Sequence, residues 1–304
     1  MTSRKILVVV DPQTTDDQPV IERAAWLAAA AGAGLELFAC DYDSDIDAGR
    51  VSQVFSIVSD ARERVLSLHR ERLETIAKPL RARGLDVSVE VVWDYPLAEA
   101  VIKKAAAHGP WLVAKDTAHH GVLQRTFLTH ADWQLITHCP APLLLVKPRP
   151  LGTPPKVLVA VDPTHEHDKP ARLDDALFTF GDALAYSADA ELHLVHAFAM
   201  PMAGVQLAPE VAGVVETEHR AALDRFLATH AVPRANVHLL QGLTHECLLR
   251  AAAEQKADFL IMGAIARRGV SKLLVGSTAS RMLDRVPCDL VIVKTPGFEI
   301  PPTR

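Results

Sequence analysis

The stretch KILVVVDP at residues 5–12 returns as KVLVAVDP at residues 156–163. Each copy is an apolar run closed by an aspartate and a proline, which is typical of a buried strand followed by a turn. The ends of the two halves match as well, because HCPAPLLLVK at residues 138–147 aligns without a gap on RVPCDLVIVK at residues 285–294. A chain of 304 residues with this repeat is predicted to be a duplication of one domain.

Each half alternates short apolar runs with amphipathic stretches. Strands that alternate with helices need crossover connections, so the predicted fold class is α/β, with two tandem, doubly wound, five-stranded parallel sheets. The proline-rich segment 148–155 is predicted to be a short stiff linker between domains 1–148 and 155–304. The predicted strands are 6–10, 35–40, 87–93, 111–115 and 143–147, then 157–161, 191–196, 237–240, 259–262 and 290–294; the predicted helices of the first half are 20–31, 51–83, 97–108 and 131–137.

Composition and charge disfavour several classes of protein. The net charge of −5 and the absence of a basic stripe argue against nucleic-acid binding and against an anionic membrane surface. Nothing resembles a signal peptide, and no apolar run reaches the ~18 residues of a membrane span, so a cytoplasmic protein is expected. The four cysteines form no CxxC pair and are predicted to be buried, reduced thiols.

The second half contains a candidate phosphate site. In doubly wound sheets, ligands bind beyond the carboxyl ends of the strands, where the strand order reverses. The predicted fourth strand runs into Met262 and Gly263, and further along Gly276-Ser277-Thr278 opens a helix whose free N–H groups and dipole suit an anion. Arg268, in the intervening loop, can add charge and hydrogen bonds to that phosphate. The plainer alternative is a turn glycine followed by an N-cap serine.

This arrangement resembles the nucleotide motif of the universal stress protein family, Gly-x-x-Gly, nine residues, Gly-Ser/Thr. Gly263 and Gly276-Ser277 match at the family spacing, whereas Ala266 replaces the second glycine. The resemblance covers nearly the whole chain and is to the tandem E type, with an adenine nucleotide alpha hydrolase-like fold. It implies that ATP, with or without Mg²⁺, binds beside Asp162, although a turn before Pro163 explains that aspartate equally well. The nucleotide-binding residues so implied are Ala160, Val161, Asp162, Ala197, Met262, Gly263, Ile265, Ala266, Arg268, Gly276, Ser277 and Thr278.

The first half departs from this motif. In the ungapped alignment, Asp116 stands for Gly263, His119 for Ala266, Thr129 for Gly276 and His130 for Ser277, so all motif glycines are lost. Asp132 falls in the first turn of the predicted helix, where its carboxylate takes the place that a phosphate would take at the helix dipole. The first half is therefore predicted not to bind ATP and to have a regulatory or structural part.

Other sites find little support in the sequence. The histidines at 119, 120 and 130, and at 165 and 167, share no cysteine at ligand spacing, so no metal site is assigned. Gly32-Ala33-Gly34 indicates a helix end rather than a dinucleotide loop. GxxxxGK[ST] and GxSxG motifs are absent, and no catalytic residue can be nominated, which leaves at most a slow ATPase.

The sequence thus predicts a stress-response protein that binds ATP or a related nucleotide through its second domain. The alternative is a tandem scaffold that binds no nucleotide and acts through protein partners, with Ala266 marking a lost site. The resemblance also implies pairing through the last strands, 143–147 and 290–294, within one chain as a pseudo-dimer, and it leaves a homodimer open.

Overall fold

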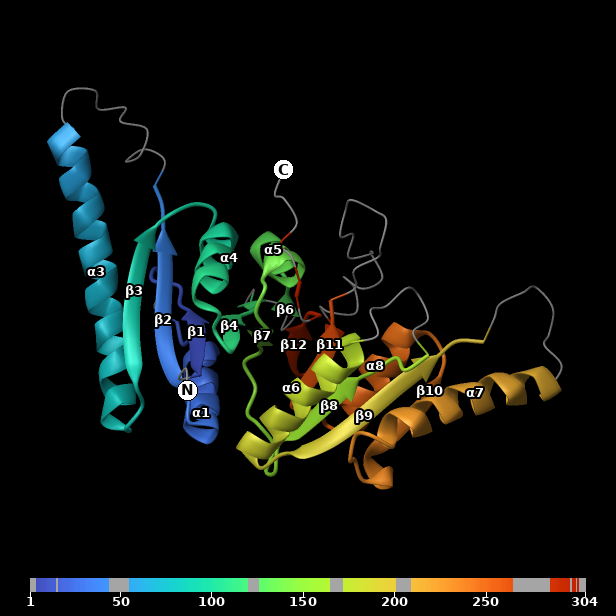
Figure 1. Ribbon diagram of the computed structural model, residues 1–304. Coiled ribbons are helices and arrows are strands. Elements are labelled where there is room, and N and C mark those ends of the chain that lie inside the picture. Colours follow the sequence, from blue (N-terminus) through green and yellow to red (C-terminus); the bar gives the residue numbers. More distant parts are fainter. Residues whose placement is uncertain are drawn as a thin grey trace. The chain divides into compact units, whose positions relative to one another are not determined.

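The computed structural model describes residues 4–14, 16–43, 55–119, 126–164, 172–200, 209–264, 285–295, 297–298 and 300. Contacts divide the chain into two compact units. The first unit is centred on Met1–Ala118 and Leu128–Pro148, and the second unit on Arg149–Glu299. Each unit is a parallel sheet with helices, as Figure 1 shows, which confirms the predicted fold class.

The first unit contains a five-stranded parallel sheet, and its strands lie close to the predicted ranges. Four described helices connect them, and a two-stranded ribbon that the sequence did not predict follows the fourth strand; its residues from His119 to Phe127 are grouped with the second unit. In chain order, the elements are β1 (Lys5–Val9), α1 (Pro19–Ala31), β2 (Gly34–Asp41), α3 (Phe55–Ala82), β3 (Val87–Trp93), α4 (Leu97–His108), β4 (Leu112–Asp116), the ribbon strands β5 (Ala118–His119) and β6 (Thr126–Phe127), α5 (His130–His138) and β7 (Leu143–Val146).

The second unit repeats this order of strands. Its described elements are β8 (Lys156–Ala160), α6 (Arg172–Ala188), β9 (Glu191–Phe198), α7 (Pro209–Leu227), the short 3₁₀ helix η1 (Arg234–Asn236), β10 (Val237–Gln241), α8 (Thr244–Glu254), β11 (Phe259–Gly263) and β12 (Asp289–Val293). The five strands agree with the predicted ranges to within two residues at either end.

The strand order is the same in the two units. It is β3-β2-β1-β4-β7 in the first unit and β10-β9-β8-β11-β12 in the second. The chain adds strands on one side of the first strand and then on the other, so the order reverses between β1 and β4 and between β8 and β11. Crossovers of this kind are right-handed, so the helices after the first two strands cover one face and the later helices the other. Consistently, α4 and α5 contact each other.

Several strands are buried along all or most of their length. All four residues of β7 and all five of β12 are buried, as are Ile6, Leu7 and Val8 of β1. Strands covered on both faces read as continuous apolar runs, which explains why the sequence locates them well. The helices end where glycine permits a left-handed turn: Gly32 has φ 61° and its N–H donates to the Ala28 carbonyl, which confirms the predicted helix end.

The predicted linker is tied to the second unit by one carboxylate. Asp258 is buried, and its Oδ1 accepts from the Gly152 N–H at 2.9 Å and pairs with Arg149 Nη2 at 3.1 Å. Its Oδ2 accepts from the Lys156 N–H at 2.9 Å. Arg149 Nη1 also donates to the Ala257 carbonyl at 2.8 Å. The segment from Arg149 onward is therefore part of the second unit rather than a free spacer.

Candidate functional site

The candidate nucleotide site lies at the strand-order reversal of the second unit. Parallel pairing places Phe259 beside Val157 and Ile261 beside Val159, so β8 and β11 end at the same edge of the sheet. Asp162 follows β8, and Met262 and Gly263 end β11. Of the predicted residues, Ala160, Val161, Asp162, Ala197, Met262 and Gly263 all gather at the carboxyl ends of β8, β9 and β11. This is the edge at which doubly wound sheets bind ligands.

Asp162 is held by two contacts. Its backbone N–H donates to Asp174 Oδ1 at 3.0 Å, and Asp174 lies in the first turn of α6 with only 1% of its surface exposed. The Thr164 hydroxyl donates to Asp162 Oδ1 at 2.8 Å. The half-buried carboxylate is thereby held at the carboxyl edge of the second unit's sheet. A carboxylate in this position can accept hydrogen bonds from hydroxyl groups or contribute to a hydrated Mg²⁺ site.

Gly263 allows the start of α6 to approach β11 closely. A Cβ built at Gly263 would lie 2.7 Å from Leu173 Cδ2 and 3.3 Å from its Cγ. Real Cβ atoms do not come so near to another carbon, so any other residue here would push Leu173 away. The glycine therefore has a packing reason of its own, in addition to the backbone access that a ligand would need.

Two buried histidines lie behind Val161, and the sequence analysis did not single them out. His196 Nδ1 lies 3.1 Å from the Val161 carbonyl, and its Nε2 lies 2.9 Å from His219 Nδ1. A carbonyl only accepts, so Nδ1 of His196 carries a hydrogen; in the neutral ring, Nε2 then accepts from His219 Nδ1–H. His219 stacks on Phe198, with 4.7 Å between ring centroids. The available signal was a histidine at a buried position of an apolar strand, in HLVHAF at residues 193–198.

The rest of the predicted site cannot be placed. Ile265, Ala266, Arg268, Gly276, Ser277 and Thr278 lie outside the described residues. His120, His165 and His167, which the sequence analysis considered as metal ligands and did not assign, also lie outside the described residues. Across the part of the chain that the structure describes, no group of three or more His, Cys, Asp or Glu residues could hold a metal ion. Within the same residues, no helix is long and apolar enough to cross a membrane.

The equivalent edge of the first unit is closed by its own side chains. Asp116 Oδ1 accepts from the Val20 N–H at 2.8 Å and so caps α1. Lys115 Nζ lies 2.9 Å from Asp132 Oδ1, and the Asp132 side chain is fully buried. Asp132 Oδ2 accepts from the Thr129 N–H at 2.7 Å, while the Thr129 hydroxyl accepts from the Asp132 N–H at 3.2 Å, which makes a capping box at the start of α5. The predicted carboxylate in the first turn of α5 is confirmed.

Polar contacts also join the ends of β1 and β2 in the first unit. The Gln13 N–H donates to Asp11 Oδ1 at 2.9 Å, and Gln13 Nε2 donates to Asp41 Oδ1 at 3.1 Å. Asp41 Oδ2 lies 2.6 Å from His69 Nε2 of α3. Asp11 thus occupies the position equivalent to Asp162, but its carboxylate accepts a hydrogen bond from Gln13 of the same loop.

Comparison with known proteins gives consistent results. The family model "Universal stress protein family" matches residues 2–147 and 155–294. Universal stress protein E of Photorhabdus laumondii is 28% identical over 98% of this chain and 97% of its own length, and that of Escherichia coli K12 is 27% identical over 98% and 96%. Among solved structures, a functionally unknown protein from Pseudomonas aeruginosa PAO1 superposes with a TM-score of 0.74 at 25% identity, covering 97% of this chain and 93% of its own.

Proposed function

Because this chain belongs to the universal stress protein family, a family of stress-response proteins, we propose that its second unit binds ATP or a related adenine nucleotide while its first unit does not. The proposal rests on one difference between the units. The last residue of the fourth strand is Asp116 in the first unit and Gly263 in the second. In the first unit, a carboxylate at this position reaches across to cap α1. In the second unit, the same position has no side chain, and the fixed carboxylate of Asp162 lies beside it.

Electrostatics support the same division. A polyphosphate needs donors and positive charge. At the first unit's edge, Thr129 and Asp132 already satisfy the start of α5, and Asp132 takes up the charge of Lys115. A phosphate there would have to displace a buried ion pair, which costs several kcal/mol. In the second unit, Asp162 and Asp174 supply no positive charge, so a phosphate there depends on Arg268 and on the N–H groups of residues 276–278, which lie outside the described residues.

Ligand-induced thermal stabilisation tests this function. With Mg·ATP well above its dissociation constant, the intact chain should melt about 2–4 °C higher. Gly276→Asp, which puts a carboxylate where the motif places phosphate, should abolish the rise. Asp162→Asn should reduce it, whereas the matched change Asp11→Asn in the first unit should leave it intact. A rise that disappears equally in Asp162→Asn and Asp11→Asn would place the nucleotide elsewhere.

A second candidate function has one observation in its favour. The contact of Gly263 with Leu173 explains this glycine without any ligand. On that basis the chain is a tandem scaffold that acts through protein partners. No thermal shift with Mg·ATP, ADP or cyclic AMP on the intact chain would favour the scaffold over the nucleotide-binding protein.

A further inference from the structure

The outer edge of β10 is open in the second unit. β10 is the last strand in its order and pairs only with β9 among the described residues. The Gly242 N–H donates to the Phe198 carbonyl on β9 at 2.9 Å. Because N–H and C=O groups alternate in direction along a strand, those of Leu240 and His238 point to β9. The groups of Val237, Leu239 and Gln241 therefore point outward.

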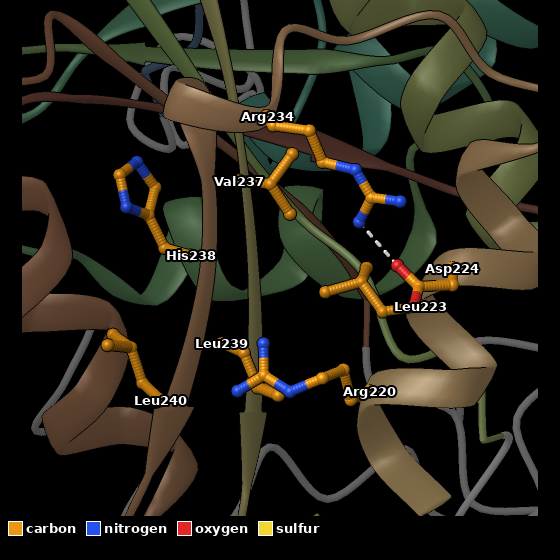
Figure 2. A pocket seen from close by; sticks show the side chains of 8 residues that line it. All are labelled: Arg220, Leu223, Asp224, Arg234, Val237, His238, Leu239 and Leu240. Atoms are coloured by element: carbon orange, nitrogen blue, oxygen red, sulfur yellow. Dashed lines mark hydrogen bonds and ion pairs between the residues drawn. The ribbon is translucent and has the colours of Figure 1, made fainter. Parts of the chain in front are cut away.

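A pocket lies along this edge, between β10 and α7. It has a volume of about 380 Å³, which is in the range of small binding sites. In Figure 2, Val237 and Leu239 lie on the side of the strand that faces Arg220, Leu223 and Asp224, whereas His238 and Leu240 lie on the other side. Leu223 is 4% exposed and forms an apolar base for the pocket.

Two arginines border the pocket. Arg220 pairs with Glu216 at 2.7 Å, with 59% of its side chain exposed, and Arg234 pairs with Asp224, with 74% exposed. A guanidinium has five N–H donors, and each of these contacts joins a single arginine nitrogen to its carboxylate. Both arginines thus retain donors directed to solvent, next to aliphatic side chains and outward-pointing backbone groups.

The first unit treats its outer edge differently. The Leu35 N–H donates to the Asp86 carbonyl, so the Val87 carbonyl of β3 points outward by the same alternation. Arg81 of α3 covers that carbonyl, with its Nε donating at 2.9 Å. Natural sheets commonly cover an outer edge in this way. At this outward carbonyl, the edge strand of the first unit is covered by a side chain of the preceding helix.

We propose that β10 is a docking site for an extended peptide segment of a partner protein, one with alternating apolar and acidic side chains. The outward backbone groups of Val237, Leu239 and Gln241 have the spacing of an added strand, which a compact small molecule does not match. Side chains of an added strand alternate between the two faces of the sheet. The carboxylates of the segment lie on the face of Val237 and Leu239 and bind Arg220 and Arg234, while its apolar side chains lie on the opposite face beside Leu240. A second copy of this chain fits less well, because two-fold pairing brings the same arginines toward each other.

Fluorescence anisotropy of labelled peptides tests the proposal on the intact chain. The probe is a heptapeptide of alternating valine and glutamate with blocked ends, and its counterpart replaces glutamate by lysine. Binding of the acidic probe is expected below about 100 μM, with the basic probe at least about fivefold weaker. No binding of the acidic probe, or equal binding of both peptides, would overturn the proposal.

Variants of the chain separate the backbone contact from the charge contact. Leu239→Pro removes an outward N–H without breaking a bond to β9 and should weaken binding about tenfold, whereas Leu239→Val should retain it. Arg220→Glu should weaken binding about fivefold, while the matched control Arg225→Glu, an exposed α7 residue outside the pocket, should not. If Arg225→Glu weakens binding as much as Arg220→Glu, or if the free chain forms dimers that Leu239→Pro dissociates, the docking site is wrong.

Discussion

The two units place different chemistry on the same backbone position at the end of the fourth strand. In the first unit, Asp116 accepts the Val20 N–H and caps α1. In the second unit, Gly263 has no side chain, and Leu173, near the start of α6, lies 2.7 Å from where a Cβ would be. A duplicated domain can thus keep its sheet while one copy places a carboxylate at this strand end and the other packs a leucine against a glycine there.

A second pair of equivalent positions lies farther from the candidate site. The strand registers make Glu36 and Glu90 of the first unit equivalent to His193 and His238 of the second. Lys104 joins the two glutamates, at 2.8 Å and 2.5 Å. In the second unit, His193 Nδ1 lies 3.1 Å from His238 Nε2, and the rings stack. One copy thus holds a charged triad where the other holds two imidazoles.

The largest expected effect comes from removing the buried carboxylate of Asp132 in the first unit. Asp132→Ala leaves Lys115 without its buried partner and removes the cap of α5, and should lower the free energy of unfolding by about 3 kcal/mol. Tryptophan fluorescence during urea unfolding reports on this unit, because Trp26, Trp93, Trp111 and Trp133 all lie in it. The exposed Asp11→Ala serves as the control and should cost under about 0.5 kcal/mol. Equal losses from both variants would contradict a special role for Asp132.

Giving the second unit the residue of the first should have the next largest effect. Gly263→Asp forces Leu173 away and should cost about 2 kcal/mol, and it should also abolish any shift caused by ATP. Circular dichroism is the suitable probe, since the second unit has no tryptophan. Gly213→Asp is the control, because a Cβ there meets nothing within 4 Å. The double variant Gly263→Asp with Leu173→Ala should regain part of the stability; no recovery would mean that the contact with Leu173 is not the cause.

Acidification should destabilise the second unit before the first, because of the His193–His238 pair. Burial lowers the pKa of His193, against the opposing effect of Glu191, and burial together with the charge of His193 lowers the pKa of His238. A folded-state pKa below the unfolded value means that the unfolded chain binds more protons, so stability falls as pH drops below about 6.5. We expect circular dichroism to report loosening before tryptophan fluorescence does. His238→Gln should remove part of this early loss.

Glu90 of the first unit responds at lower pH. Burial opposes ionisation of Glu90, but the hydrogen bond and charge of Lys104 prevail and lower its pKa. The stability that this contact supplies is present above the unfolded value of about 4.3 and is lost as pH falls below it. Simultaneous loss of both signals near pH 6 would contradict this order of events.

The smallest effect is expected from the reverse exchange, Asp116→Gly. It removes the acceptor of the Val20 N–H and should cost about 1 kcal/mol, measured by tryptophan fluorescence. Asp116→Asn keeps an acceptor oxygen and should cost less. Neither variant should create an ATP-dependent shift in the first unit, because Asp132 and Lys115 still close its edge. A new shift in Asp116→Gly would show that this single carboxylate keeps nucleotide out.

The strands were predicted well from the sequence, because a strand of a parallel sheet that is covered on both faces consists of one continuous apolar run. The helix of residues 97–108 was predicted with the observed bounds. The β5–β6 ribbon was missed, because strands of two residues leave no periodic pattern. Parallel register and repeat comparison sufficed to bring Asp162 and Gly263 to one edge.

Side-chain partnerships were much harder to predict than elements. His196 and His219 lie on different elements, and their contact with Val161 depends on the register of β8 with β9 and on the approach of α7. The capping of α1 by Asp116 joins residues 96 positions apart. Periodicity carries no information about such pairs. The part of the nucleotide motif from Ile265 to Thr278 stays a prediction, because it lies outside the described residues.

The contacts of Asp258 bear on how the protein is dissected. A fragment that began at Pro155 would retain this buried carboxylate but lose Arg149 and Gly152, two of the groups that neutralise or bond it. The second unit would be less stable in such a fragment than in the whole chain, and a ligand affinity measured on the fragment would not apply to the whole chain. A fragment that begins at Arg149 keeps the full set, so the natural cutting point lies six residues earlier than the proline-rich sequence suggests.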